Sequence, residues 1–78
     1  MGKISSVEPT TITIESEYIT LGQFLKFAGI ISMGSEAKSY LSQNETVVNG
    51  EKEARRGRKL RPGDLVVLPK GTYQIAKR

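Results

Sequence analysis

Hydrophobic residues recur with two different periods along this chain, and the change of period predicts the order of its elements. Threonine and isoleucine alternate in residues 10–14, which is typical of a strand with one buried face. We expect Ile12 and Ile14 to face the core. In residues 21–28 the apolar positions are spaced three and four apart, which predicts a helix with one apolar stripe. The stripe consists of Leu21, Phe24, Leu25 and Ala28.

Local signals define both ends of this first helix. Thr20 and Gln23 have the spacing of a capping box, in which each side chain accepts a hydrogen bond from the other residue's backbone amide. Ile19 and Phe24 have the spacing of a hydrophobic staple across the same cap. Gly29 favours the left-handed conformation that ends many helices. We therefore predict a helix of about two and a half turns between Thr20 and Gly29.

A second short helix is predicted for residues 34–43. Ser32 is the expected N-cap, and Glu36 in the first turn would interact favourably with the helix dipole. The inward-facing positions should be Ala37, Tyr40 and Leu41.

The second half of the chain has the turn residues of a β-structure. Asn49-Gly50 lies between the short segments 46–48 and 51–54, and this dipeptide favours a type I′ hairpin. We interpret Asn49-Gly50 simply as that turn.

Two further strands are predicted after the hairpin. The apolar run 65–68 fits a buried strand, and residues 72–76 can form a last strand. Pro62 and Gly63 suit the central positions of a type II turn. The whole pattern predicts an α+β fold in which two short helices pack on one side of a small, mostly antiparallel sheet.

Composition narrows the class of protein. A chain of 78 residues forms one small domain, which we place at residues 10–78 after a flexible lead-in at residues 1–9. There is no cysteine and no histidine, which excludes disulfides and the usual zinc sites and fits a reducing compartment. No apolar run approaches the ~20 residues of a membrane span, and the N-terminus lacks the apolar core of a signal peptide. We expect a cytoplasmic monomer without metal, cofactor or small-molecule substrate.

The positive charge is concentrated in the second half of the chain. Residues 1–45 hold three lysines and five glutamates, a net −2, whereas residues 46–78 hold nine basic and three acidic residues, a net +6. Six of the residues in positions 52–61 are basic, and among them arginine outnumbers lysine four to two. The planar guanidinium group of arginine matches the oxygens of a phosphate. A basic cluster between two tight turns predicts a fixed surface for a polyanion such as nucleic acid. The cluster consists of Lys52, Arg55, Arg56, Arg58, Lys59 and Arg61.

The predicted helices add weaker candidates for phosphate contact. Lys26 lies late in helix one, where it serves either the helix dipole or a ligand. Lys38 lies one turn into helix two, where the dipole does not favour it, so phosphate contact is the better interpretation. Gly34 and Ser35 offer backbone amides that suit a phosphate, although an ordinary start of a helix explains them equally well.

The remaining polar and aromatic residues indicate binding rather than catalysis. Tyr18 could stack on an unpaired base, Tyr40 fits the core, and Tyr73 fits either role. Asp64 is the only aspartate, and it fits a turn in which its side chain caps nearby backbone. The glutamates show no paired acid and base placement, so we expect no enzyme.

The order of two helices, a Val-Asn-Gly hairpin and a Leu-Arg-Pro-Gly-Asp turn resembles the RNA-binding domain named after ribosomal small-subunit protein four, here called the S-four domain. The resemblance covers residues 20–68. Residues 18–26 and 49–64 are similar to the short stand-alone bacterial S-four proteins called YaaA. The resemblance implies binding to structured RNA, ribosomal RNA above all, and a role in ribosome assembly or translation. The matching residues are Leu21, Leu25, Ala37, Leu41, Val47, Val48, Asn49, Gly50, Leu60, Pro62, Gly63 and Asp64.

The chain departs from the family pattern at two places. A typical S-four domain opens with Arg-Leu-Asp, and here the triplet is Thr20-Leu21-Gly22. Helix two typically starts with Ser-Arg or Thr-Arg, and here that pair is Met33-Gly34. Two alternatives to RNA binding remain: an adaptor whose basic loop docks an acidic protein, and a small β-grasp-like carrier, although such carriers end in Gly-Gly.

Overall fold

The computed structural model describes residues 9–78, and apart from Pro9 the expected lead-in lies outside them. The helical elements are α1 (Leu21–Phe27), the 3₁₀ turn η1 (Gly34–Glu36) and α2 (Ala37–Gln43). The main sheet consists of β1 (Thr10–Ile14), β3 (Val47–Val48), β4 (Glu51–Lys52), β6 (Leu65–Leu68) and β7 (Gly71–Lys77). A separate pair joins β2 (Ile19–Thr20) to β5 (Lys59–Leu60). The predicted α+β class is confirmed.

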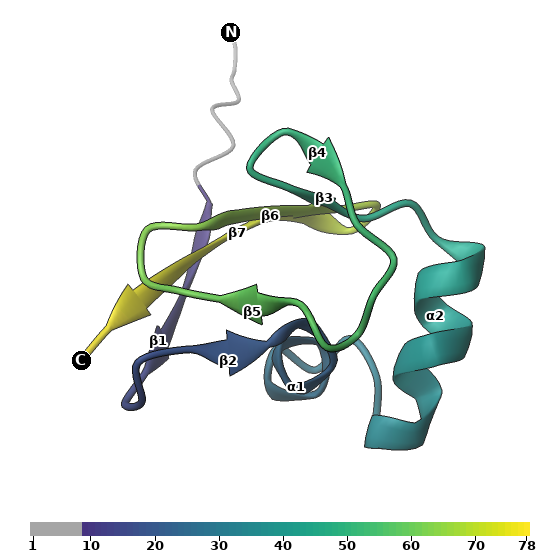
Figure 1. Cartoon of the computed structure of the whole chain (residues 1–78), viewed down its shortest axis with the longest axis horizontal. Helices are drawn as coiled ribbons and strands as arrows, with labels where there is room; N and C mark the ends of the chain where they lie inside the picture. Colours follow the sequence, from purple (N-terminus) through teal and green to yellow (C-terminus); the bar gives the residue numbers. More distant parts are fainter. Residues whose placement is uncertain (1–8) are drawn as a thin grey trace, which may run out of the picture.

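The main sheet has the order β1-β7-β6-β3-β4. Three of its pairs are antiparallel, whereas β1 and β7 are parallel. Figure 1 shows α1 and the β2–β5 pair on one side of this sheet, with α2 beside them. None of the helices in residues 9–78 is long and apolar enough to cross a membrane.

The first helix has the predicted ends. The Gln23 amide donates to Thr20 Oγ1 at 3.3 Å and the Thr20 amide donates to Gln23 Oε1 at 3.1 Å, which confirms the capping box. At the other end Gly29 has φ +79°. The Gly29 amide donates to the Lys26 carbonyl at 3.1 Å, and the Ile30 amide donates to the Leu25 carbonyl at 2.9 Å. These two bonds form a Schellman motif, which stops the helix.

The second helix starts differently from the prediction. Its first turn is the 3₁₀ turn η1, and the N-cap position belongs to Met33, so the assignment of Ser32 as cap is wrong. Instead, Glu36 Oε1 accepts hydrogen bonds from the Ser32 amide at 2.8 Å and the Met33 amide at 3.0 Å. The bonds from Met33 and then Ser32 hold the pKa of Glu36 below its usual value. The Glu36 carboxylate thus takes the capping role that was expected of the Ser32 hydroxyl.

Both predicted turns have the required backbone. Asn49 (φ 52°) and Gly50 (φ 85°) are both left-handed, as a type I′ hairpin demands. Gly63 has φ +96°, and the Asp64 amide donates to the Arg61 carbonyl at 3.0 Å, which closes the type II turn.

The strand at residues 65–68 is present, but the prediction that it is buried is wrong for one of its faces. Val66 and Leu68 are buried, whereas Leu65 and Val67 remain about two-fifths exposed. This alternation is typical of a sheet covered by helices on one side only.

The core lies between the sheet and the two helices, with Phe24 at its centre. Phe24 is fully buried and meets Tyr73 edge to face, with ring centroids 5.4 Å apart. Tyr73, whose role the sequence left open, thus packs against the core, as do Tyr40 and Ile12. The buried apolar residues are Ile14, Leu21, Phe24, Leu25, Ile31, Ala37, Leu41, Val48, Leu60, Val66, Leu68 and Ile75.

Truncation of the central ring should therefore unfold much of the domain. We expect Phe24→Ala to lower the free energy of unfolding by ~3–5 kcal/mol, because it leaves a cavity and removes the contact with Tyr73. Chemical denaturation measures the loss. Phe27→Ala on the same helix is the matched control: its side chain is largely exposed, so we expect a change within ~0.5 kcal/mol. Equal losses in both variants would contradict the helix register.

Candidate nucleic-acid interface

The loop that connects β4 to β5, residues 53–58, lies on the first turn of α1 (Figure 1). The Leu21 amide donates to the Arg58 carbonyl and the Gly22 amide donates to the Arg56 carbonyl, both at 2.8 Å. These bonds satisfy two of the amides that lack partners at a helix N-terminus. The β2–β5 pair continues the contact, with Thr20 opposite Lys59. We call residues 53–58 the basic loop.

Gly22 allows this close approach. A Cβ atom at Gly22 would lie 3.3 Å from the Arg56 Cβ and 3.4 Å from the Ala37 Cβ, closer than most such contacts. The glycine that replaces the acid of the usual Arg-Leu-Asp triplet therefore makes room for the basic loop and α2. The sequence showed Gly22 only as a departure from the family pattern, because its neighbours are distant in the chain.

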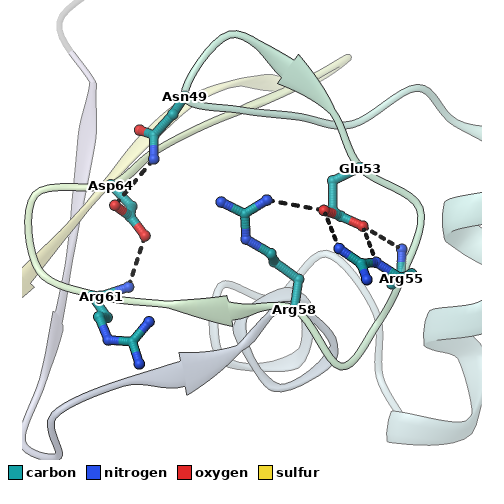
Figure 2. A network of polar contacts seen from close by, with 6 residues as sticks. All are labelled: Asn49, Glu53, Arg55, Arg58, Arg61 and Asp64. Atoms are coloured by element: carbon teal, nitrogen blue, oxygen red, sulfur yellow. Dashed lines mark hydrogen bonds and ion pairs between the residues drawn. The ribbon is translucent and has the colours of Figure 1, made fainter.

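Glu53 holds two arginines of the basic loop. Its carboxylate is buried and accepts hydrogen bonds from Arg55 Nε and Arg58 Nη1, both at 2.9 Å, and from the Arg55 amide at 3.1 Å (Figure 2). The hydrogen bond from the Arg55 side chain, and then that from Arg58, lower the pKa of Glu53 to about 2 against the opposing effect of burial. Glu53 in turn raises the pKa of Arg55.

The two arginines are exposed to different degrees. The Arg55 side chain is 80% exposed, whereas that of Arg58 is 28% exposed. Arg55 thus presents most of its guanidinium to solvent while one edge is fixed by Glu53. Glu53 was not predicted from the sequence; the available signal was one acid within the basic run of residues 52–61.

A second polar link joins the hairpin to the Pro-Gly turn. Asn49 Nδ2 donates to Asp64 Oδ1 at 3.1 Å, and the Leu65 amide donates to Asn49 Oδ1 at 2.9 Å. Asp64 Oδ2 accepts from the Arg61 amide at 2.9 Å, as expected of a turn-capping aspartate (Figure 2). Asn49 is therefore both a turn residue and a cross-link between two turns fifteen residues apart.

Most of the predicted binding residues line two hollows. The first, of about 530 Å³, is lined by four of the basic residues together with Gly57, and is here called the basic hollow. The second, of about 370 Å³, contains Lys26, Gly34, Arg56 and again Gly57. Cations from α1 and from the basic loop thus meet around Gly57. The four basic residues of the first hollow are Arg55, Arg58, Lys59 and Arg61.

The other predicted residues lie apart from these hollows. Lys52 forms an ion pair with Glu45 at 3.6 Å and lines a different depression. Ser35 and Lys38 are exposed on η1 and α2 and line neither hollow. The Glu36 carboxylate accepts from the amides of Ser32 and Met33 just before η1, and its charge would oppose a phosphate at this helix start.

Comparison with known proteins identifies the family of this chain. The model of the S4 domain, the S-four domain named above, matches residues 12–76. The chain belongs to the S4 domain family. It is also 51% identical over 65 residues to a Bacillus subtilis (strain 168) protein named "Probable ribosome maturation protein RlbA". That alignment covers 82% of this chain and 92% of the relative, so the two S4 proteins match over nearly the whole of the shorter one.

The network around Glu53 predicts a pH-dependent stability. The pKa of Glu53 is lowered from the usual 4.5 to about 2, so the folded state binds fewer protons than the unfolded state between these values. Its stabilisation is therefore complete above pH 4.5 and is lost as the pH falls towards 2. We expect Glu53→Gln to destabilise the protein by ~1–3 kcal/mol at pH 7 and to flatten this acid limb. Thermal unfolding between pH 7 and pH 2 measures both effects.

Glu51→Gln is the control for this variant, because Glu51 is an exposed acid on the neighbouring strand. It removes the same charge and should change the melting temperature little at any pH. If the two variants have the same pH profile, Glu53 does not organise the basic loop.

Proposed function

We propose that this S4 protein binds structured RNA by clamping its phosphates with the basic loop and β5, and that the RNA is ribosomal. The name of the Bacillus subtilis relative refers to ribosome maturation, which supports a role in ribosome assembly. Such a role would place the protein in the cytoplasm. The protein acts in this proposal as a binding module and not as an enzyme.

The arginine arrangement around Glu53 carries the proposal. Free arginine side chains lose conformational entropy when they bind, which weakens binding. Here the side chains of Arg55 and Arg58 are fixed in advance by one carboxylate, and amides of α1 hold the backbone carbonyls of Arg56 and Arg58. Charge-assisted bonds from guanidinium groups to phosphate oxygens are short and directional. A preorganised set of such groups suits a folded RNA of defined shape, because phosphate spacing then decides the fit.

The number of contacts can be bounded by the geometry. Six basic residues lie in residues 52–61, and Lys26 and Arg56 line the adjoining hollow. Lys52 is engaged by Glu45, and the inner edge of Arg58 by Glu53. We therefore propose roughly four to six phosphate contacts, which should give a steep dependence of affinity on salt.

This proposal predicts that the affinity for RNA depends more on where the positive charges lie than on the net charge of the protein. We expect Arg56→Ala with Arg61→Ala to weaken binding to a ribosomal RNA fragment at least tenfold and to lower the salt slope by about 1.5. The expected slope change follows from about 0.7–0.9 per lost phosphate contact. Filter binding or fluorescence anisotropy over a range of salt concentrations measures both quantities. Both side chains are exposed, so the fold should persist.

Lys70→Ala with Lys77→Ala is the matched control, because it also removes two positive charges from exposed sites. Neither residue lines the two hollows, so affinity should fall less than threefold. An equal loss in both double variants would mean that net charge alone attracts RNA. An affinity that does not change with salt would instead favour the adaptor that docks an acidic protein. Crosslinking in cells, with sequencing of the attached RNA, would identify the RNA itself.

A further inference from the structure

A third hollow beside the basic surface contains two exposed aromatic side chains. It has a volume of about 550 Å³ and is lined by Tyr18, the residue before β2, and by Phe27 from the last turn of α1. The exposed fraction is 41% for Tyr18 and 62% for Phe27. Half-buried Ile19 and exposed Lys26 line the same hollow. We call it the aromatic hollow.

Cations border this hollow on two sides. Lys59 Nζ lies 4.9 Å and Arg61 Cζ lies 6.0 Å from the centroid of the Tyr18 ring, within the range of cation–π attraction. Both cations belong to the basic hollow, whereas neither lines the aromatic hollow. The Tyr18 ring therefore stands at the boundary between the two. On the other side Lys26 is shared with the hollow that contains Arg56 and Gly57.

We propose that the aromatic hollow receives one unpaired base of the bound RNA, stacked on Tyr18 and Phe27, while the adjoining phosphates bind Lys26, Lys59 and Arg61. This inference rests on the proposed RNA binding and specifies the RNA: a helix with a bulged or looped-out nucleotide. An apolar peptide would fit the aromatic rings but not the three surrounding cations. A nucleotide has a flat aromatic base and an anionic phosphate side by side, which matches this juxtaposition.

The geometry also predicts how selective the site is. Stacking on an aromatic ring tolerates every base, because each base has a π face. The hollow is lined by apolar surface and the polar groups of Ser16, Gln23 and Lys26, and among residues 9–78 no buried side-chain polar atom is left without a hydrogen-bond partner. We therefore infer selection for an unpaired nucleotide in a given position, without strong preference for its identity.

The test uses two synthetic RNA hairpins that contain 2-aminopurine, a base whose fluorescence is quenched by stacking. In the first hairpin this base is bulged, and in the second it is paired in the stem. Tyr18→Leu and Phe27→Ala should each weaken binding to the bulged hairpin about fivefold to a hundredfold, the range for one lost stacking contact. They should leave the affinity for the paired hairpin and both salt slopes unchanged. Tyr18→Phe keeps the ring and should bind like the wild type.

The outcomes separate this inference from the proposed function. If the wild type binds both hairpins equally and Arg56→Ala with Arg61→Ala still weakens both, RNA binding stands and the base site is wrong. If Tyr18→Leu and Phe27→Ala weaken both hairpins alike, the hollow is a general contact and the inference also fails. If the protein binds neither hairpin and no ribosomal RNA fragment, the proposed function itself is wrong. Should sedimentation show self-association that Phe27→Ala abolishes, the hollow docks a second copy instead of a base.

Discussion

The contact between the basic loop and the first turn of α1 is the constraint on which the candidate interface depends. A loop with this charge density would repel itself and remain mobile if only water surrounded it. Two helix amides hold its carbonyls, and Gly22 leaves space for the backbone to approach. The orphan donors of a helix N-terminus and the orphan acceptors of a loop thus satisfy each other. The helix that supports the core consequently also sets the positions of the arginines.

Two acidic residues, Glu53 and Asp64, order the basic loop and the turn that carries Arg61. Glu53 takes part of the hydrogen-bonding capacity of two arginines and reduces the local positive charge, both of which oppose RNA affinity. In return, it fixes the direction in which the remaining N–H groups point. Asp64 acts in the same way through the backbone, because it orders the turn that carries Arg61. For a partner of defined shape, this preorganisation reduces the entropy lost on binding, which acts against the loss of charge.

The sequence predicted the features that depend on neighbouring residues and missed those that depend on distant ones. The capping box at Thr20, the left-handed Asn49 and the turn at Gly63 each follow from chemistry within four residues. The β2–β5 pair could not be predicted, because two strands of two residues each carry almost no periodic signal. The parallel β1–β7 pair joins opposite ends of the domain, and the burial of Glu53 depends on packing around it. Each would have required the fold to be known first.

The departures from the family pattern acquire a physical meaning in this fold. The helices of this chain lack the arginines that the pattern places at their starts: Thr20 and Gly34 stand at those positions, and Gly22 replaces the acid of the first triplet. Gly22 lets the basic loop lie against α1, so Arg56 from the loop lines the same hollow as Lys26. The positive charge beside α1 therefore comes from Lys26 and from the basic loop. The exposed rings of Tyr18 and Phe27 lie next to Lys59 and Lys26, which is why an RNA seated on the proposed surface would meet them.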